Sequence, residues 1–311
     1  MNEPIQFDGV ERRFGASEVL RGLSFAVRPG EVYALLGRNG AGKTTALRIL
    51  LGFLQPLSGR ARLLGCDSER LTPALRERVG LVSEGQRLYG ALRLREVLAF
   101  EAGTRRAFDR ELARRVLARL ELPLELRVRQ LSRGMRAQLA LVLAVACRPE
   151  VLVLDDPGLG LDAAARRELL DALIELLGRD GCSVLFTSHV LSDVERVADR
   201  VGFLHQGRLR LEDSVHALPR RAERRVLRSR IELGESLAHT PGLLRARRVA
   251  EGYELSLLDA GAERLRELSA LGELSEPIPL DLEQLFLELT SEGREAALVA
   301  ELAREPMEVV R

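Results

Sequence analysis

The feature that most constrains what this chain can fold into is a glycine-rich stretch at residues 37–45. It matches the phosphate-binding loop pattern G-x-x-x-x-G-K-[ST] at every fixed position. Because glycine has no Cβ, such a backbone can wrap a phosphate with its N–H groups pointing inward, and the following helix adds the positive end of its dipole. The stretch therefore predicts a nucleotide site, and the residues expected at the nucleotide are Gly37, Arg38, Asn39, Gly40, Ala41, Gly42, Lys43, Thr44 and Thr45.

Lys43 and Thr44 carry the chemistry of this loop. In the pattern, the lysine reaches the β- and γ-phosphates and the hydroxyl after it ligates Mg²⁺. Lys43 is the only lysine in the chain, because all the other residues among the 47 Lys and Arg are arginine. A compact ammonium and a planar guanidinium differ most where one charge must fit between phosphate oxygens. Residues 31–36 read as a buried strand and residues 46–54 as an apolar-periodic helix, so the strand–loop–helix context of the motif is present.

Length and composition bound the class of protein. A chain of 311 residues with 46% hydrophobic content favours about two globular domains with a sizeable core. A formal net charge of +1 provides no global field for nucleic acid or an anionic membrane, so we expect no nucleic-acid partner. The longest apolar run, at residues 139–147, is far shorter than the 18 or more residues of a membrane span, and the start has no signal-peptide pattern. We therefore expect a cytoplasmic protein.

Two regions surround the nucleotide motif in the sequence. Residues 5–10 and 23–27 alternate as strands and predict a small β-layer. Phe14 lies on the loop expected between them, where its ring either stacks on a purine or packs against the sheet. Residues 94–122 have helical periodicity with arginines interleaved by acidic residues, which indicates a helical subdomain at about 90–145 with a solvated face.

Further candidates for the site lie downstream. Residues 151–155 form an apolar strand pattern that ends in Asp155 and Asp156. A carboxylate at the carboxyl end of a parallel strand, beside a phosphate loop, can hold Mg²⁺ through its waters and orient an attacking water. His189 comes just past the apolar strand at 183–187, and a lone histidine is more often structural. Ser132 and Gly134 begin an apolar helix whose N-terminus suits an anion, although residues alone also allow a simple capped helix.

In this order and spacing, these motifs resemble the ATP-binding subunit of an ABC transporter, over about residues 5–215. The resemblance implies an α/β fold: a P-loop NTPase domain of the ABC type with a mixed central sheet, an antiparallel β-layer and a helical subdomain. It also implies roles for residues of this sequence, namely adenine stacking for Phe14, signature contacts to phosphate for Ser132 and Gly134, the Walker B carboxylate for Asp155, the D-loop for residues 160–162 and the switch histidine for His189.

The sequence departs from the family pattern at three places. The general-base glutamate of the family corresponds to Asp156 here, and the Q-loop glutamine falls on Glu84, with Gln86 as a second possible register. The signature motif reads SRGM after its leucine, where the family has SGGQ. These departures bear on turnover and coupling more than on nucleotide binding. With Asp156 and Glu84 at these family positions, the resemblance implies two sets of residues. The expected catalytic residues are Lys43, Glu84, Asp156 and His189, and the expected metal ligands are Thr44, Glu84 and Asp155.

The rest of the chain, residues 217–311, is expected to form a small α+β accessory domain after an ATPase domain at 1–216. Residues 220–225 read as a charged link, 228–233 and 253–258 as strands, and 261–269 and 282–289 as helices. The closing pattern at 282–290 resembles the extension of ATPases that are paired with ABC-2 type permeases. Dimer stabilisation is our working hypothesis for this domain.

Together, the resemblance implies a subunit that binds and hydrolyses ATP with Mg²⁺ and powers a separate integral membrane permease, in an export system. It would pair with a second copy of itself or a related ATPase subunit, and lie on the cytoplasmic face of the membrane through the permease. Two alternatives stay open. A nucleotide-binding regulatory subunit with very weak hydrolysis is suggested by Asp156 and Glu84. A soluble ABC ATPase without a transport role is the other.

Overall fold

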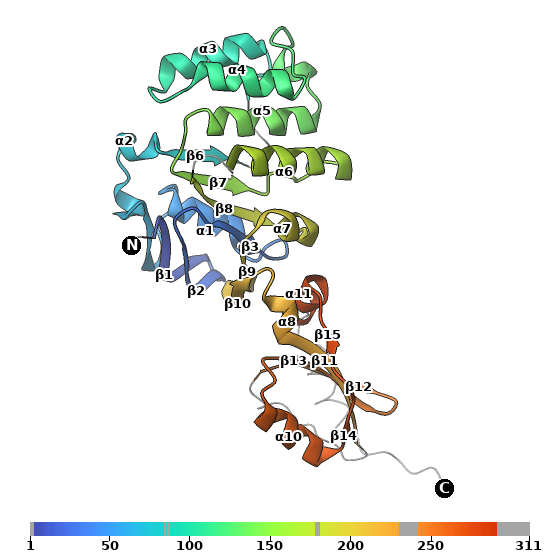
Figure 1. The fold of residues 1–311 in the computed structure, drawn as a ribbon. Coiled ribbons are helices and arrows are strands. Elements are labelled where there is room, and N and C mark those ends of the chain that lie inside the picture. Colours follow the sequence, from blue (N-terminus) through green and yellow to red (C-terminus); the bar gives the residue numbers. More distant parts are fainter. Residues whose placement is uncertain (1–2, 84, 86–87, 178–180, 230–241, 291–311) are drawn as a thin grey trace. The chain divides into compact units, whose positions relative to one another are not determined.

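The computed structural model describes residues 3–83, 85, 88–177, 181–229 and 242–290. The chain divides into two compact units, Met1–Glu212 and Asp213–Arg311. Figure 1 shows both units, with elements labelled where there is room, and the units are described one at a time below.

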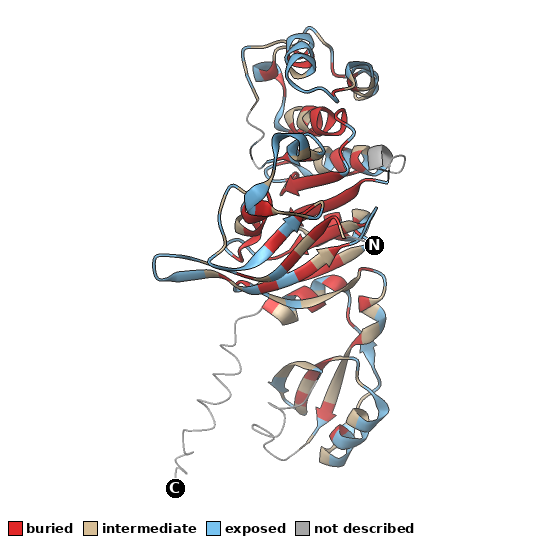
Figure 2. Cartoon of the chain, turned by 90° about the vertical axis from the view of Figure 1, so that its left-hand side faces the viewer, coloured by how far each residue is buried: buried red, intermediate tan, exposed pale blue. Residues whose placement is uncertain are grey.

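The core of the first unit is a largely parallel sheet with the strand order β10-β9-β3-β8-β7-β6. The strands from β6 to β9 along this order pair in parallel. β10 follows β9 after the two residues 206–207, which fits only an antiparallel neighbour, so the sheet is mixed as expected. Every residue of β7 and β8 is buried, as in a sheet covered on both faces, and these strands are red in Figure 2. The bounds are β3 Val32–Leu36, β6 Val79–Val82, β7 Val151–Asp155, β8 Ser183–Ser188, β9 Arg200–His205 and β10 Arg208–Ser214.

An antiparallel layer with the order β2-β1-β4-β5 packs beside this sheet. Its strands are β1 Ile5–Phe14, β2 Ser17–Val27, β4 Ser58–Leu63 and β5 Cys66–Asp67. The rings of Phe7 and Phe25 stack at 4.6 Å, and Phe25 stacks on Tyr33 of β3 at 5.0 Å, so one aromatic column joins the two sheets. The prediction that Phe14 lies on a loop is wrong. Phe14 pairs with Ser17, which makes it the last residue of β1 and leaves only a two-residue turn.

Helices link and cover these layers. α1 (Lys43–Leu50) lies between the sheets, in contact with β7 and with β2 and β4. α6 (Ala163–Leu177) follows β7 along the chain, and α7 (Leu191–Val197) follows β8 and packs on β3. α6 also contacts both α5 and α7. Two short elements, the 3-10 helix η1 (Ser68–Arg70) and α2 (Pro73–Arg76), lead from β5 to β6.

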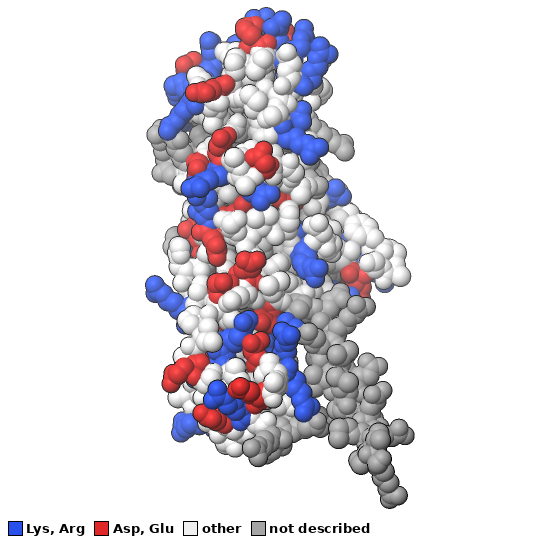
Figure 3. All heavy atoms as spheres, turned by 90° about the vertical axis from the view of Figure 1, so that its right-hand side faces the viewer, with Lys and Arg blue, Asp and Glu red and all other residues white. Residues whose placement is uncertain are grey.

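The expected helical subdomain is present and has an apolar core of its own. It consists of α3 Leu94–Thr104, α4 Arg110–Arg119, the 3-10 helix η2 Val128–Gln130 and α5 Arg133–Val145. Exposed arginines here pair with acidic side chains, as in Arg105–Glu101 at 3.0 Å and Arg148–Asp109 at 2.9 Å. Both charge signs are interspersed over the face of the molecule in Figure 3. The arginine-rich segment is therefore a mixed, ion-paired surface.

The second unit is an α+β domain whose sheet has the order β12-β13-β11-β14, with β15 paired to β11. The helices expected near 261–269 and 282–289 and the strand at 253–258 are confirmed. The bounds are α8 Leu218–Arg221, β11 Ala222–Arg228, β12 Leu243–Val249, β13 Gly252–Leu258, α10 Ala262–Leu271, β14 Glu273–Leu274, β15 Ile278–Pro279 and α11 Leu282–Thr290.

The charged link expected at 220–225 is wrong, because most of it belongs to β11. The strand tolerates its charges because they are paired: Arg225 donates to Glu223 at 2.7 Å, and Arg224 donates to the buried Glu288 at 3.3 Å. The strand expected at 228–233 overlaps β11 only at Arg228, where β11 ends, and residues 230–233 lie outside the described residues. No helix in the part of the chain that the structure describes is long and apolar enough to cross a membrane.

Candidate nucleotide-binding and hydrolysis site

The phosphate loop connects β3 to α1 and depends on glycine at two positions. Gly42 has φ +111 at the N-cap of α1, and a Cβ there would lie 2.8 Å from Leu20 Cδ2 and 2.9 Å from the carbonyl oxygen of Val19. A Cβ on Gly37 would lie 2.6 Å from the carbonyl oxygen of Leu204. Close packing of β2 and β9 against the loop thus fixes where its backbone runs.

Lys43 is the first residue of α1, and its side chain turns back into the loop. Only 8% of the residue is exposed. Its Nζ donates to the carbonyl oxygens of Gly37 at 2.6 Å and of Arg38 at 3.2 Å. The first N–H groups of α1 have no carbonyl partner within the helix, so the ammonium and these amides supply positive potential at one place.

Oxygen atoms meet at the carboxyl ends of β7 and β8, beside this loop. Asp155 Oδ1 accepts from Thr44 Oγ1 at 3.1 Å and from Thr187 Oγ1 at 2.9 Å. Thr187 is the register partner of Asp155 in β8, and its hydroxyl also accepts from the amide of Asp156 at 3.0 Å. Sequence reasoning missed Thr187, and the only available signal was its place next to the end of an apolar strand.

This group of oxygens suits a hard cation such as Mg²⁺, which prefers oxygen ligands and usually takes only one or two carboxylates from the protein. No group of three or more His, Cys, Asp and Glu that could hold a metal ion occurs among the described residues. The hydroxyl of Thr44 and the carboxylate of Asp155 are oxygen donors of the kind that Mg²⁺ takes from proteins.

Asp156 and His189, which come from different loops, are hydrogen-bonded to each other. His189 Nδ1 lies 2.7 Å from Asp156 Oδ2. Asp156 has φ +44, an uncommon conformation for a residue with a Cβ, and its carbonyl oxygen accepts from Leu159 N at 3.0 Å in a turn. The carboxylate at the start of this turn thus meets the loop after β8 at His189. The sequence predicted both residues as site residues, and the structure brings them into contact.

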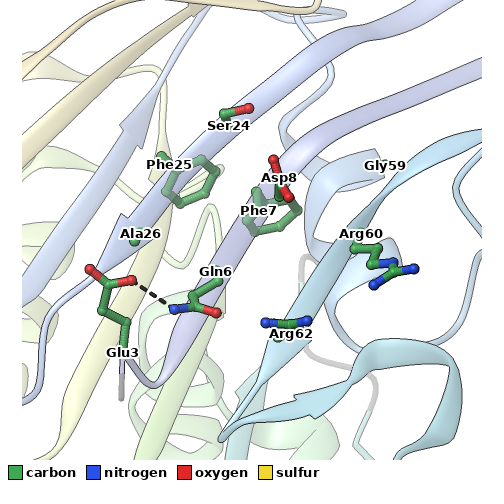
Figure 4. Close-up of a pocket in the computed structure, with 10 residues that line it drawn as sticks. All are labelled: Glu3, Gln6, Phe7, Asp8, Ser24, Phe25, Ala26, Gly59, Arg60 and Arg62. Atoms are coloured by element: carbon green, nitrogen blue, oxygen red, sulfur yellow. Dashed lines mark hydrogen bonds between the residues drawn. The ribbon is translucent and has the colours of Figure 1, made fainter. Parts of the chain in front are cut away.

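The phosphate loop and the two aspartates line one open pocket of about 470 Å³, a size that suits a small ligand. Phe14 is 47% exposed there, and the guanidinium of Arg12 lies 4.8 Å from its ring centroid. Val19 and Leu159 add apolar walls that the sequence analysis did not single out. The lining residues are Phe14, Val19, Asn39, Gly40, Gly42, Lys43, Thr44, Thr45, Asp155, Asp156 and Leu159. A larger hollow, shown in Figure 4, lies on the antiparallel layer and contains none of the predicted site residues.

Ser132 and Gly134 do not line this pocket. Ser132 caps α5 through a hydrogen bond from Met135 N to its hydroxyl at 3.1 Å. A Cβ on Gly134 would lie 2.8 Å from the Cβ of Ala165, so this glycine permits close packing of α5 on α6. The structure thus does not bring the signature residues to the phosphate loop of the same chain. Glu84 and its alternative Gln86 lie outside the described residues.

Comparisons with known proteins identify the family of the chain. A family model described as "ABC transporter" matches residues 20–158. The chain is 40% identical over 220 residues to the Nod factor export ATP-binding protein I of Burkholderia orbicola (strain AU 1054), which covers 69% of this chain and 72% of that protein. It is 35% identical over 310 residues to the daunorubicin resistance ATP-binding protein DrrA3 of Streptomyces coeruleorubidus, with 93% and 96% covered.

The fold of the first unit is likewise shared with solved structures. One described as the structure of an ATP binding subunit of an ABC transporter superposes with a TM-score of 0.61 at 28% identity, over 70% of this chain and 92% of that one. The match to DrrA3 spans nearly the whole chain and so includes the second unit. This chain therefore belongs to the ATP-binding subunits of ABC transporters, a family of ATPases.

Proposed function

We propose that this chain is the ATPase subunit of an ABC export system and that it drives a separate integral membrane permease from the cytoplasmic face of the membrane. The observation that carries the proposal is that the phosphate loop, the Thr44–Asp155 pair and Asp156 meet at one pocket. Export is supported by two relatives, one named for Nod factor export and the other for daunorubicin resistance.

Each residue at the pocket has a task in ATP hydrolysis. Phosphoryl transfer needs little covalent chemistry from the protein, so positioning and charge neutralisation carry most of the catalysis. Lys43 and the N-terminus of α1 bind the β- and γ-phosphates. Asp156 orients the attacking water and accepts its proton, and His189 holds that carboxylate through the 2.7 Å hydrogen bond. Phe14 stacks on adenine through the ring face that Arg12 does not cover.

Thr44 and Asp155 are the residues we propose for Mg²⁺, and Glu84, outside the described residues, is a third expected ligand. Thr44 Oγ1 and Asp155 Oδ1 share a hydrogen bond of 3.1 Å, so these two residues are close enough to face one ion or its waters. When bound, the ion neutralises charge on the transferred phosphoryl group.

The signature residues Ser132 and Gly134 act on a second protomer in this proposal. Ser132 caps α5 and Gly134 lies in its first turn, and neither lines the pocket of its own chain. In this proposal the N-terminus of α5 binds the γ-phosphate held by a partner. The partner is a second copy of this chain or a related ATPase subunit.

The single lysine gives a direct test of the nucleotide site. An amine-reactive reagent has only one lysine to modify, Lys43, and the N-terminal amine serves as an internal reference in the same sample. We expect ATP to slow modification of Lys43 and to leave the reference unchanged, as read by mass spectrometry. Lys43→Ala should abolish ATP binding or turnover without loss of fold, and equal labelling with and without ATP would contradict the assignment.

Transport is tested by co-expressing this chain with candidate membrane permeases from the same genome. We expect the ATPase rate of the purified subunit to rise in the complex, and inverted vesicles that contain the complex to accumulate substrate only with ATP. ATP-dependent transport with a negligible hydrolysis rate would favour the regulatory reading. Hydrolysis that neither couples to a permease nor responds to one would favour an ABC ATPase without a transport role.

A further inference from the structure

Arg166 contacts the loop that carries Asp156, although it has no place in the machinery described so far. It lies in the first turn of α6, and its Nη2 donates to the carbonyl oxygen of Leu161 at 3.4 Å. Its Cγ, Nε and Cδ would all lie within 3.2 to 3.4 Å of a Cβ on Gly158, so the stem runs flat along that glycine. One side chain thus contacts both ends of the turn that follows Asp156.

The guanidinium of Arg166 also faces α7, the helix that follows His189. Its Nε lies 3.9 Å from Oδ2 of Asp193, which is a charge contact and too long for a hydrogen bond. Asp193 is only 6% exposed, and Arg166 Nε is buried without a hydrogen-bond partner among the described residues. Burial raises the pKa of Asp193, while the field of Arg166 opposes that rise, and the charges of Asp156 and His189 also reach this carboxyl.

Asp193 is buried but the Arg166 side chain is 24% exposed, and a half-buried pair of this kind adds little stability by itself. Removing two charges from water costs several kcal/mol per ion, and apolar residues of the same volume often pack as well or better. The same two helices already share a second ion pair near the surface, because Arg196 Nε of α7 donates to Asp171 Oδ1 of α6 at 3.0 Å. The side chains of that surface pair are 34% and 49% exposed. Holding α6 against α7 therefore does not require Arg166.

We propose that Arg166 and Asp193 are positioning residues for ATP hydrolysis. By contacting the turn at 158–161 and facing α7 at once, Arg166 fixes the separation of the loops after β7 and β8. That separation decides whether Asp156 and His189 keep their 2.7 Å hydrogen bond. The inference rests on the proposed function of Asp156 and His189, and it adds two residues that do not line the nucleotide pocket.

The test compares the buried pair with the surface pair in the full-length protein. Arg166→Met keeps the length of the stem and removes the guanidinium, and Asp193→Asn keeps shape and removes the charge. Arg196→Met and Asp171→Asn are the matched controls on the same two helices. We expect kcat to fall about tenfold to hundredfold in both test variants, because a misplacement of about 1 Å at a reacting group has that effect. ATP affinity stays unchanged, as for an interaction that acts in the transition state.

The controls should change kcat by less than about twofold, because exposed ion pairs contribute little. Equal losses of kcat in the test and control variants, with matching losses of thermal stability, would show that the buried pair only packs the helices. If Arg166→Met does not fold, Asp193→Asn decides the matter by the same criterion.

A double variant separates positioning from a general structural effect. In the Asp156→Asn background, Arg166→Met should lower the residual kcat no further, because the residue it positions is already disabled. A full additional loss would overturn the inference. Asp156→Asn alone distinguishes the two levels of the proposal. If it leaves kcat intact, the proposed role of Asp156 as the base fails. If Asp156→Asn lowers kcat and only the Arg166 and Asp193 variants behave like the controls, the inference alone fails.

Discussion

At the scale of single residues, the proposed general base Asp156 leads us to expect slow hydrolysis. A general base must come within about 2.6 to 3.2 Å of the water it activates. Aspartate is one methylene shorter than glutamate, so its oxygen falls roughly 1 to 1.5 Å short unless the turn at φ +44 brings it forward. We expect Asp156→Glu to raise kcat with little change in ATP affinity, as measured by steady-state hydrolysis and nucleotide titration.

Asp156→Asn is the counterpart of that change. It keeps the size of the side chain and removes the base, so kcat should fall on the order of a hundredfold to ten-thousandfold. Should glutamate give no gain and asparagine no loss, Asp156 is not the base, and Glu84 becomes the first alternative to test.

The raised pKa of Asp193 predicts how the stability of the folded protein depends on pH. This pKa is raised above 3.8, first by burial, with Arg166 opposing, Asp156 adding and His189 opposing. Over the window between the ordinary and the raised value, the folded protein binds a proton that the unfolded chain has lost. The contribution of Asp193 to the free energy of unfolding is therefore complete below the pKa that Asp193 has in the unfolded chain. It is lost as the pH rises through the pKa that Asp193 has in the folded protein.

Asp193→Asn removes this titration, so the variant should gain stability relative to the parent as the pH rises from about 4 to about 7. Denaturant unfolding at several pH values measures the difference, and Asp171→Asn at the surface pair is the control. A difference between Asp193→Asn and the parent that stays constant with pH would contradict the prediction.

At the scale of elements, the junction between the phosphate loop and α1 is held by close contacts at Gly42 that Gly40 does not make. Gly40 has φ +82 but nothing lies within 4 Å of a Cβ placed there, whereas Gly42 has φ +111 and would clash with β2. Gly40→Ala should therefore cost about 1 to 2 kcal/mol of unfolding free energy for the left-handed backbone alone. Gly42→Ala should cost about 1 to 3 kcal/mol more, because β2 must shift to admit the methyl group.

Urea unfolding of the nucleotide-free protein measures both variants under the same conditions. Equal costs would mean that β2 and the loop move apart freely, and that the close approach of Val19 and Leu20 does not constrain α1. A larger loss of unfolding free energy in Gly42→Ala would show that packing on the antiparallel layer stabilises the loop.

At the scale of the whole molecule, the absence of Ser132 and Gly134 from the pocket lining predicts that a complete site needs two protomers. With Asp156→Asn to slow hydrolysis, ATP should convert the protein to a dimer in sedimentation velocity. ATP should leave the sedimentation coefficient of the Lys43→Ala variant unchanged. A monomer at all concentrations of ATP would count against the shared site. A dimer without nucleotide would assign the association to the second unit. The shared site would then be tested by whether ATP lowers the dissociation constant of that dimer.

The sequence by itself determined the features that depend on local pattern. The phosphate loop, the buried strands at 151–155 and 183–188, the helices at 94–119 and the helix at 282–290 all have a motif or a period that a short window contains. Where charge and period disagreed, the local prediction was wrong. The arginines at 220–225 suggested a link, but most of that stretch belongs to β11, where Arg224 is paired with the carboxylate of Glu288 in α11.

Only the tertiary structure decided which of these residues meet. Thr187 reaches Asp155, and His189 reaches Asp156, because β8 is the parallel neighbour of β7, and strand order is not written in any local period. The need for glycine at position 42 depends on β2, and the Arg166–Asp193 contact depends on how α6 packs on α7. The chemistry of the site was readable from residue types, whereas its geometry arises from pairings between segments far apart in the chain, which packing alone selects.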